Sequence, residues 1–497
     1  MKDARELAQK VWNYANVLYD DGVGVADYVE QITCLLFLKM DEERAENMGD
    51  PSLVPDGYRW GDLTGKSGPE LEQQYRHTLE TLATQPGLLG TIYRKAQNKI
   101  QDPAKLERMV SLIDRETWIG LPVDVKGNIY EDLLERTASE SKTGAGQYFT
   151  PRPLIDAVVE VMQPRIGERV HDPACGTGGF LIAAYEHMRK GEKDKRRLRT
   201  LRHETFTGRD ITDGVVRLCA MNLYLHGIGG DNEAPVAQGD SLIDDPGRRF
   251  EKVLTNPPFG KKSSYTFVGA DGAAGRETMT YERQDFVATT SNKQLNFLQH
   301  IMTILAENGS AAVVLPDNVL FEGGAGERIR RKLLERFDFH TLLRLPTGIF
   351  YKPGVKANVL FFDKKPAAEK PWTQHLWIYD LRTNQHFTLK ERPLERHHLD
   401  DFVACYKPGR RADREESERF RCFSYDELVA RDKANLDIFW LKDDSLEDAD
   451  SLPAPEVLAN EIVENLEAAL EQLGRVAEEL AGGSGDAGEA PEKGAAE

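Results

Sequence analysis

The sequence predicts an α/β fold with a doubly wound, mainly parallel sheet, preceded by an α-helical N-terminal domain and followed by an acidic helical tail. From residue 169 to 345, short apolar stretches alternate with amphipathic ones, a pattern typical of parallel strands joined by helices. Two of the short stretches run directly into distinctive turns, DPACGTGGF at 172–180 and NPPFG at 256–260. Open α/β sheets bind ligands at the carboxyl ends of their strands, so both turns are expected at one ligand-binding edge.

The first turn predicts a cofactor-binding βα unit. A short strand at 169–171 leads to Asp172, glycines follow where the backbone must turn sharply, and a helix is expected over 180–188. The unit is Rossmann-like, yet it lacks the GxGxxG pattern that holds a pyrophosphate. An acidic residue before a G-x-G-G turn suits a cofactor without a pyrophosphate, and the carboxylate would face a cationic, methionine-like end. A tight turn in an unrelated α/β domain is the alternative interpretation of this stretch alone.

The second turn predicts a rigid corner that presents hydrogen-bond acceptors. A buried strand is expected over 251–255, and the two prolines after Asn256 fix φ and remove two backbone donors. The side-chain oxygen of Asn256 and the carbonyl of Pro257 could each accept a hydrogen from one planar NH2 group. This pairing would turn the nitrogen lone pair toward an electrophilic methyl group, while Phe259 offers a face for a stacked base. A structural Pro-Pro turn is the alternative for NPP alone.

The two turns and the motifs around them carry a specific resemblance. The further motifs are GAGQYFTPRPL (144–154), FTGRDI (206–211), MNLYLHGI (221–228), GDSL (239–242) and the run that continues NPPFG to residue 301. In this pattern, which covers about residues 1–365, the sequence resembles the S-adenosylmethionine-dependent amino-methyltransferases of DNA. More narrowly, it resembles the modification (M) subunits of type I restriction-modification systems.

The resemblance implies a site-specific DNA methyltransferase. It would transfer a methyl group from S-adenosylmethionine to N6 of an adenine that is flipped out of double-stranded DNA. Cytosine N4 has the same NH2 geometry, although NPPF and the motif order favour adenine. The implied partners are a specificity (S) subunit, a restriction (R) subunit and a second copy of this chain in a two-M-one-S complex. A partner would then read the target sequence.

The resemblance also assigns roles to individual residues. Asp210, at the end of a strand over 205–210, would accept the ribose hydroxyls, where the family commonly has the longer Glu. Asp240, in a strand and turn over 235–242, would bind the adenine amino group of the cofactor. The expected catalytic residues are Asn256, Pro257, Pro258 and Phe259, with no metal. The expected cofactor-contacting residues are Gln147, Tyr148, Phe149, Thr150, Pro151, Arg152, Asp172, Ala174, Gly176, Thr177, Gly178, Gly179, Asp210, Asp240 and Leu242.

Acidic side chains are concentrated at the C-terminal end of the chain. The formal net charge is −18, and residues 443–497 hold 16 acidic side chains against the two basic ones of Arg475 and Lys493. That segment therefore carries −14, and the rest of the chain only −4. A near-neutral body is not expected to bind DNA tightly through counterion release, which points to a partner for most of the DNA contact.

Composition and hydropathy indicate a cytoplasmic protein. No apolar run approaches the length of a membrane span, and the charged first residues do not resemble a signal peptide. The five cysteines lie far apart without a CxxC pair, so we expect neither a zinc site nor a disulfide framework.

We expect five segments: a helical N-terminal domain (1–127), the methyltransferase domain (128–365), an α/β appendage (366–442), an acidic partner-binding helix (443–482) and a disordered tail (483–497). The spacing of Ile462, Leu466 and Leu470 favours a helix that binds a partner, and a solvated terminal helix is the alternative.

Local patterns predict several element boundaries. Helices are expected over 70–83 and 103–114, with a loop over 55–63. A further helix over 296–309 would stop at Gly309, and a strand over 357–365 would close the sheet. Residues 261–293 show no clear periodicity, so they are expected to form a long loop over flipped DNA, with Lys261, Lys262 and Arg283 on phosphates.

Three other functions stay open on the sequence alone. A protein glutamine N5-methyltransferase would present a planar amide to the same corner, but the long loop and the helical N-terminal domain count against it. An inactive scaffold would keep the fold only to hold a DNA-reading partner, and the intact Asp172, Gly176, Gly178, Asn256 and Phe259 count against that. A stand-alone DNA methyltransferase would need its own target-recognition domain, and none is apparent.

Overall fold

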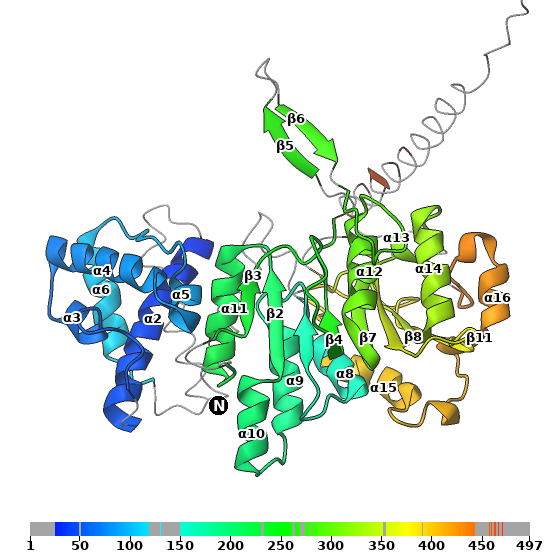
Figure 1. Cartoon of the computed structure of the whole chain (residues 1–497), viewed down its shortest axis with the longest axis horizontal. Helices are drawn as coiled ribbons and strands as arrows, with labels where there is room; N and C mark the ends of the chain where they lie inside the picture. Colours follow the sequence, from blue (N-terminus) through cyan, green and yellow to red (C-terminus); the bar gives the residue numbers. More distant parts are fainter. Residues whose placement is uncertain are drawn as a thin grey trace, which may run out of the picture.

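The protein, seen here as a computed structural model, has a group of helices followed by one large mixed sheet (Figure 1). The structure describes residues 25–48, 51–118, 130, 150–229, 233–260, 264–268, 274–278, 280–350, 354–389 and 391–442, together with Val457, Ala459, Ile462, Val463, Leu466 and Leu470. Among these residues, no helix combines the length and the apolar character that crossing a membrane requires.

The N-terminal part is helical, as predicted. Its described helices are α2 (Val25–Met48), α3 (Trp60–Thr64), α4 (Gly68–Ala83), α5 (Gly87–Tyr93) and α6 (Pro103–Asp114). The expectation of a loop over 55–63 is wrong at its end, because the Asp62 side chain accepts from the backbone N of Arg59 at 2.9 Å and caps α3. Trp60 then buries its ring and donates from Nε1 to Asp114 at the end of α6, at 2.8 Å.

In the described part of the chain, nine strands form the main sheet, in the order β11-β10-β8-β9-β7-β4-β1-β2-β3 (Figure 1). Parallel pairing joins β3 to β2, β2 to β1, β1 to β4, β4 to β7 and β8 to β10, which confirms a mainly parallel sheet. The strands are β1 (Val170–Asp172), β2 (Phe206–Asp210), β3 (Val236–Gln238), β4 (Phe250–Thr255), β7 (Leu305–Pro316), β8 (Phe337–Arg344), β9 (Ala357–Lys364), β10 (His375–Asp380) and β11 (Phe420–Ser424).

The strand β9 lies inside the sheet, so the expectation that it closes the sheet is wrong. It pairs antiparallel with β7 on one side and with β8 on the other. Beyond β8 the sheet continues through β10 and β11, which come from residues after 365. Strand order is a non-local property, and the local pattern of β9 cannot reveal its neighbours. The expected division of the chain at residue 365 stays a prediction, with the sheet running across it.

Helices cover both faces of the sheet, because alternate strand residues point to opposite sides. On β4, Leu254 joins the core that includes Leu154 of α8 and Leu181 of α9, whereas Val253 joins the core of α12 and α14. This is the doubly wound arrangement that the alternating pattern predicts. The remaining helices are α8 (Arg152–Met162), α9 (Gly179–Arg189), α10 (Lys195–His203), α11 (Asp213–Leu225), α12 (Lys293–Ile304), α13 (Asn318–Phe321), α14 (Ala325–Arg336), α15 (Asp400–Tyr406) and α16 (Tyr425–Ala430), with short 3-10 helices η2 (Arg396–Leu399), η3 (Arg411–Asp413) and η4 (Asp432–Ala434).

The expected helix end at Gly309 is wrong, because α12 ends at Ile304 and β7 begins at Leu305. Gly309 instead lies inside β7, at a position where there is no room for a side chain. A Cβ at this position would lie 2.9 Å from the carbonyl oxygens of both Phe250 and Ala306. Only glycine therefore lets β7 approach β4 where the register between them shifts, at Phe250 to Lys252.

The region expected as an irregular loop over 261–293 contains a separate hairpin, which corrects that expectation. Strands β5 (Ser264–Val268) and β6 (Ala274–Thr278) pair antiparallel in a two-stranded sheet of their own (Figure 1). The Gly- and Ser-rich composition of the region hid a short run of strand-forming residues at 265–268.

A buried arginine joins the helical part to the sheet part. Arg217 of α11 donates from Nε to the carbonyl of Ile92 at 2.6 Å and from Nη2 to that of Arg94, at the end of α5. Its Nη1 lies 2.5 Å from Oε1 of Glu30 in α2. Because Arg217 is almost fully buried, this contact fixes α11 against α2 and α5.

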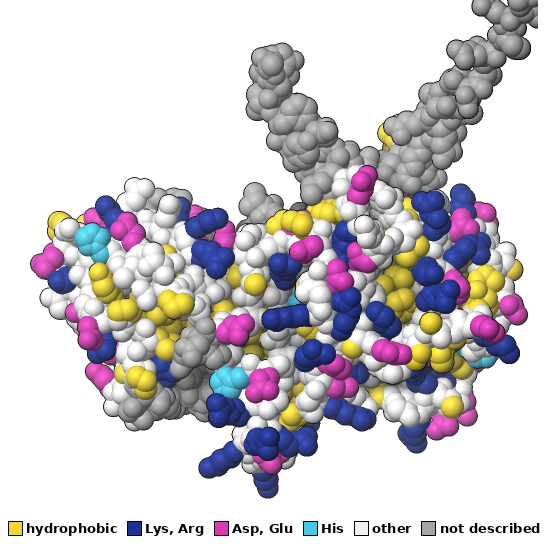
Figure 2. All heavy atoms as spheres, viewed as in Figure 1, with side chains coloured by type: hydrophobic (Ala, Val, Ile, Leu, Met, Phe, Trp, Pro, Cys, Tyr) yellow, Lys and Arg dark blue, Asp and Glu magenta, His cyan; other side chains and the backbone are white. Residues whose placement is uncertain are grey.

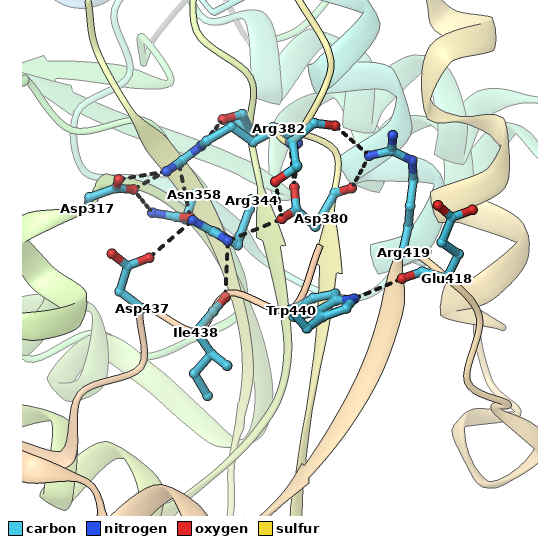
Figure 3. Close-up of polar contacts among 12 residues, drawn as sticks. Asp317, Arg344, Asn358, Asp380, Arg382, Glu418, Arg419, Asp437, Ile438 and Trp440 are labelled. Carbon is cyan, nitrogen blue, oxygen red and sulfur yellow. Dashed lines mark hydrogen bonds and ion pairs between the residues drawn. The ribbon is translucent and has the colours of Figure 1, made fainter. Parts of the chain in front are cut away.

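Charged side chains hold the segment that contains Asp437 and Ile438 against the carboxyl edge of the sheet (Figure 3). Arg344, at the end of β8, is 0% exposed and donates to Asp380 at 3.1 Å and to the carbonyl of Ile438 at 3.0 Å. Arg344 also pairs with Asp437 at 3.2 Å, so both ends of its guanidinium are used. The segment that contains Asp437 and Ile438 is therefore fixed at this edge.

Candidate active site

The glycine-rich turn joins β1 to α9 through two residues in left-handed conformations. Gly176 has φ +52° and Gly178, the N-cap of α9, has φ +88°. A Cβ on Gly178 would lie 3.0 Å from Cys219 of α11, whereas one on Gly176 would meet no atom within 4 Å. Gly178 thus permits close helix packing, and Gly176 leaves an open side on which a ligand can approach the backbone.

The neighbouring elements hold this turn in place. Asn222 of α11 donates from Nδ2 to the carbonyl of Thr177 at 2.9 Å. The backbone N of Cys175 donates to the backbone carbonyl of Arg209, near the end of β2, at 3.0 Å. Ser241 donates from its hydroxyl to the carbonyl of Pro173 at 2.7 Å. The turns after β1, β2 and β3 are therefore brought together, as the sequence predicts.

Asp172 lies at the bottom of this site with its carboxylate buried. Its Oδ1 accepts from the backbone N of Ala174 at 3.0 Å. Burial raises the pKa of Asp172 to about 7, since the charged form loses its hydration. A cation placed against this carboxylate would restore the ionised form, so Asp172 fits the positive end of a ligand.

Asp210 lies at the end of β2 and contacts the glycine-rich turn. It accepts from the backbone N of Gly176 at 3.3 Å through one carboxylate oxygen and from that of Thr212 at 3.0 Å through the other. Burial raises the pKa of Asp210 above its usual value. Asp210 lies at the end of the strand, as the sequence predicts, and the structure adds a direct contact with Gly176 of the turn.

Asp240 is held by a residue that the sequence did not single out. Its Oδ1 accepts from the backbone N of Leu242 at 2.9 Å, and its Oδ2 accepts from the Tyr281 hydroxyl at 2.7 Å. Tyr281, Leu242 and Phe297 form a small buried cluster, against which Ala174 packs. The segment after the hairpin thus forms part of the predicted cofactor site.

Asn256 occupies the predicted corner after β4, with only 5% of its surface exposed. Its Nδ2 donates to the hydroxyl of Thr150 at 2.9 Å. Its Oδ1 is buried and has no hydrogen-bond partner among the described residues. The backbone N of Gly260 donates to the carbonyl of Pro258 at 3.0 Å, so the corner closes on itself. An acceptor without a partner is thus held at the point where the sequence predicts one.

The Phe259 ring is buried next to the corner and meets the Phe350 ring edge-to-face. The two ring centroids lie 5.1 Å apart with an interplanar angle of 82°. An edge-to-face aromatic pair fixes the orientation of both rings. Phe350 therefore supports Phe259, and no local pattern predicts this pairing, because 91 positions separate the two residues in the chain.

The QYFTPR stretch is only partly described. Gln147, Tyr148 and Phe149 lie outside the described residues, and Thr150 contacts Asn256. Arg152, at the start of α8, pairs with Asp156 at 3.0 Å and with Glu186 of α9. Its guanidinium thus ties α8 to α9 in this structure.

Comparison with known proteins identifies the family. The profile described as "N-6 DNA Methylase" matches residues 122–439, and that of the "HsdM N-terminal domain" matches residues 7–113. The chain belongs to the N-6 DNA methylase family. Its sequence is 39% identical to the type I restriction enzyme StySJI methylase subunit of Salmonella typhimurium, covering 98% of this chain and 97% of the relative. It is also 39% identical to the EcoKI methylase subunit of Escherichia coli, covering 96% of this chain and 95% of the relative.

Solved structures of type I methylases share the fold of this N-6 DNA methylase. A chain from a study of complex assembly and conformational transition of a type I restriction-modification system has 28% identity and a TM-score of 0.71, covering 97% of this chain and 99% of that one. The EcoKI M protein has 34% identity and a TM-score of 0.53, with 96% of each chain covered. The protein is thus the methylase subunit of a type I system, an adenine-N6 DNA methyltransferase that uses S-adenosylmethionine.

One expectation for this N-6 DNA methylase is wrong: Arg283 is not available for phosphates. Its side chain is nearly buried, pairs with Asp285 at 2.6 Å and donates to the carbonyl of Leu242 at 3.3 Å. Its guanidinium also lies over the Phe286 ring, 4.2 Å from the centroid. Charge alone gives no information on burial, and Arg283 instead ties the segment after the hairpin to the turn after β3.

Exposed basic side chains instead gather on α10. Figure 2 shows Lys and Arg at the lower end of the molecule, where Figure 1 places α10. Lys195, Arg196, Arg199 and Arg202 are exposed there. Because α10 leads into the amino end of β2, this patch lies at the edge opposite the glycine-rich turn.

Proposed function

We propose that this methylase subunit holds the amino group of a flipped adenine between the side-chain oxygen of Asn256 and the carbonyl of Pro257. The observation that carries this proposal is the buried Oδ1 of Asn256, which has no partner among the described residues. An unpaired buried acceptor is costly, and a donor from the base would satisfy it. Two acceptors on one NH2 group would make its lone pair available to an electrophile.

The buried ring of Phe259 is proposed to stack on the flipped base. Its orientation is fixed by Phe350, and Pro257 and Pro258 restrict the backbone that leads to it. Rigid positioning of this kind supports catalysis, because the reacting groups meet without further loss of conformational freedom. Direct methyl transfer at this corner requires no covalent intermediate between the protein and the base.

The turns after β1, β2 and β3 are proposed to hold the cofactor. S-adenosylmethionine, when bound, supplies an electrophilic methyl group on a positively charged sulfonium. The buried carboxylate of Asp172 suits that positive charge, Gly176 leaves the backbone open, and Asp210 and Asp240 present carboxylates to hydroxyl and amino groups.

Two exposed apolar side chains complete this proposed pocket. Ile211 follows Asp210 and is 64% exposed, while Ile243 follows Leu242 and is 62% exposed. Such large exposed apolar groups on two neighbouring turns suit the flat face of a purine. Neither was expected from the sequence, in which each is one apolar residue beside a more conspicuous acidic one.

We further propose that the chain acts with a specificity subunit, a restriction subunit and a second copy of itself, in the cytoplasm where its DNA substrate lies. The near-neutral body and the position of the α10 patch support a partner for most of the DNA contact. Ile462, Leu466 and Leu470 are helical and exposed, which supports docking of the acidic C-terminal helix on a partner.

The decisive experiment measures methyl transfer from labelled S-adenosylmethionine to DNA, by this chain alone and with its specificity subunit. We expect N6-methyladenine only in the mixture, and no more than a small residual amount with Asn256→Ala. Label in protein would instead support a glutamine methyltransferase. Cofactor binding without any transfer in either mixture would support a scaffold and contradict the proposed catalytic role.

A further inference from the structure

The catalytic corner contains a contact between two buried side chains from distant parts of the chain. Thr150 lies just before α8 and Asn256 just after β4, yet Nδ2 of Asn256 donates to Oγ1 of Thr150 at 2.9 Å. Both residues are buried. Among the described residues, Thr150 is the partner of the amide nitrogen, and the amide oxygen has none.

The direction of an asparagine amide decides what it can bind. One end of the amide accepts a hydrogen and the other end donates two, and a half-turn about χ2 exchanges them. With Oδ1 toward the target, Asn256 accepts an amino hydrogen of the base. With Nδ2 toward the target, two donors would face each other and the base would be repelled. In the productive orientation Nδ2 points away from the base, where a hydrogen-bond acceptor stabilises it, and the Thr150 hydroxyl accepts from Nδ2 in this structure.

The position of Thr150 is itself well fixed. The carbonyl of Pro151 accepts from the backbone N of Leu154 at 3.0 Å and from that of Ile155 at 3.1 Å, which starts α8 directly after Thr150. Leu154 and Ile155 are buried in the core on one face of the sheet. Thr150 thus lies two residues before a helix that cannot shift without disturbing that core.

We propose that Thr150 is a positioning residue for methyl transfer. Its hydroxyl accepts from Nδ2 of Asn256 and so directs Oδ1 toward the amino group of the target base. The resemblance assigned Thr150 to the cofactor, whereas its side chain contacts Asn256. The inference rests on the proposed role of Asn256 and adds a second residue to the same step.

The test compares Thr150→Val and Thr150→Ser in the complete complex with the specificity subunit. Valine keeps the shape of threonine without the hydroxyl, and serine keeps the hydroxyl. We expect Thr150→Val to lower kcat by about 10- to 100-fold, with KM for S-adenosylmethionine and DNA within about threefold of wild type. Thr150→Ser should recover most of the loss.

Two further variants separate this role from a general loss of structure. Thr373→Val removes another buried, hydrogen-bonded hydroxyl far along the chain, between Phe337 and Phe339, and should leave kcat unchanged. In an Asn256→Ala background, Thr150→Val should have no additional effect on residual kcat, because the two residues act on one step. If Thr150→Val does not fold, Thr150→Ala compared with Thr150→Ser gives the same contrast in a less crowded site.

Full kcat in Thr150→Val would overturn the inference. So would a defect limited to cofactor affinity, which would assign the hydroxyl to the cofactor. Full activity in Asn256→Ala would instead remove the proposed role of Asn256 itself. A silent Thr150→Val beside an inactive Asn256→Ala would leave that role intact and reject only the role of Thr150.

Discussion

The hydroxyl of Tyr281 donates to Oδ2 of Asp240 at 2.7 Å, which joins the segment after the β5–β6 hairpin to the turn after β3. This hydrogen bond, together with the Arg283 contact to Leu242, connects the proposed cofactor pocket to the part of the chain that follows the catalytic corner. The contribution of the Tyr281 hydroxyl to cofactor binding can therefore be measured.

Tyr281→Phe should raise the Kd for S-adenosylmethionine by about 3- to 20-fold, because Asp240 loses the donor that orients its carboxylate. At saturating cofactor, kcat should not change. Calorimetric titration of the complex measures the affinity directly. Tyr379→Phe is a matched control, since Tyr379 donates to Asp401 at the same 2.7 Å distance in another part of the chain. An equal change in both variants would contradict the assignment.

Cofactor affinity should depend on pH through Asp172. Its pKa of about 7 in the folded chain lies above the usual value of 3.8, so near pH 6 the carboxyl is mostly protonated. Binding of a cation favours the ionised form, and the affinity should therefore rise with pH and level off above the pKa. We expect up to about a tenfold gain between pH 6 and pH 8. Titrations at several pH values measure it, and Asp172→Asn should give a weaker and flat profile.

The raised pKa of Asp172 also makes the stability of the cofactor-free protein depend on pH. Because the folded pKa of Asp172 is raised, the stability that this group contributes is fully present below about pH 4 and is lost as the pH rises to about 7. Asp172→Asn should remove this part of the pH dependence in thermal unfolding.

Arg217→Ala should destabilise the protein by about 3–5 kcal/mol, because it leaves Glu30 and two backbone carbonyls at the junction without their partner. Denaturant unfolding measures the loss, and Arg217→Lys should recover only part of it, since lysine cannot reach three groups in one plane. A loss as small as that of an exposed ion pair, below about 1 kcal/mol, would show that the junction does not depend on Arg217.

Gly309→Ala should destabilise the sheet by about 1–3 kcal/mol, because its Cβ would press on two backbone oxygens that cannot move aside. Gly214→Ala is a matched change in α11, where a Cβ meets no atom within 4 Å. That variant should be neutral or more stable by up to about 1 kcal/mol. Thermal unfolding of the two variants should therefore shift in opposite directions or by clearly different amounts.

The sequence predicted those features that depend on neighbouring residues. The turn from Asp172 to Gly179 and the corner at Asn256 each combine a strand end with glycine or proline, and both lie where they were expected. The helices α4 and α6 follow from local periodicity in the same way. These signals are contained within about ten residues, which is the range over which backbone preferences act.

The sequence could not predict contacts between distant segments. Nothing near Thr150 indicates that it meets Asn256, and nothing near Tyr281 indicates Asp240. Arg283 has the charge of a phosphate ligand, but its burial against Phe286 is decided by the fold around it. Gly309 has the local signature of a helix end, while its actual constraint is the backbone of β4.

Strand β9 also determines when β8 can be joined to β7 and the rest of the sheet. A chain emerges from the ribosome N-terminus first, so β7 and β8 emerge before their shared neighbour β9. Until residue 364 has emerged, the sides of β7 and β8 that β9 covers expose unpaired backbone groups, which can recruit strands from other chains. Insertion of β9 between them joins β8 to the rest of the sheet and covers the two sides of β7 and β8 that would otherwise stay unpaired.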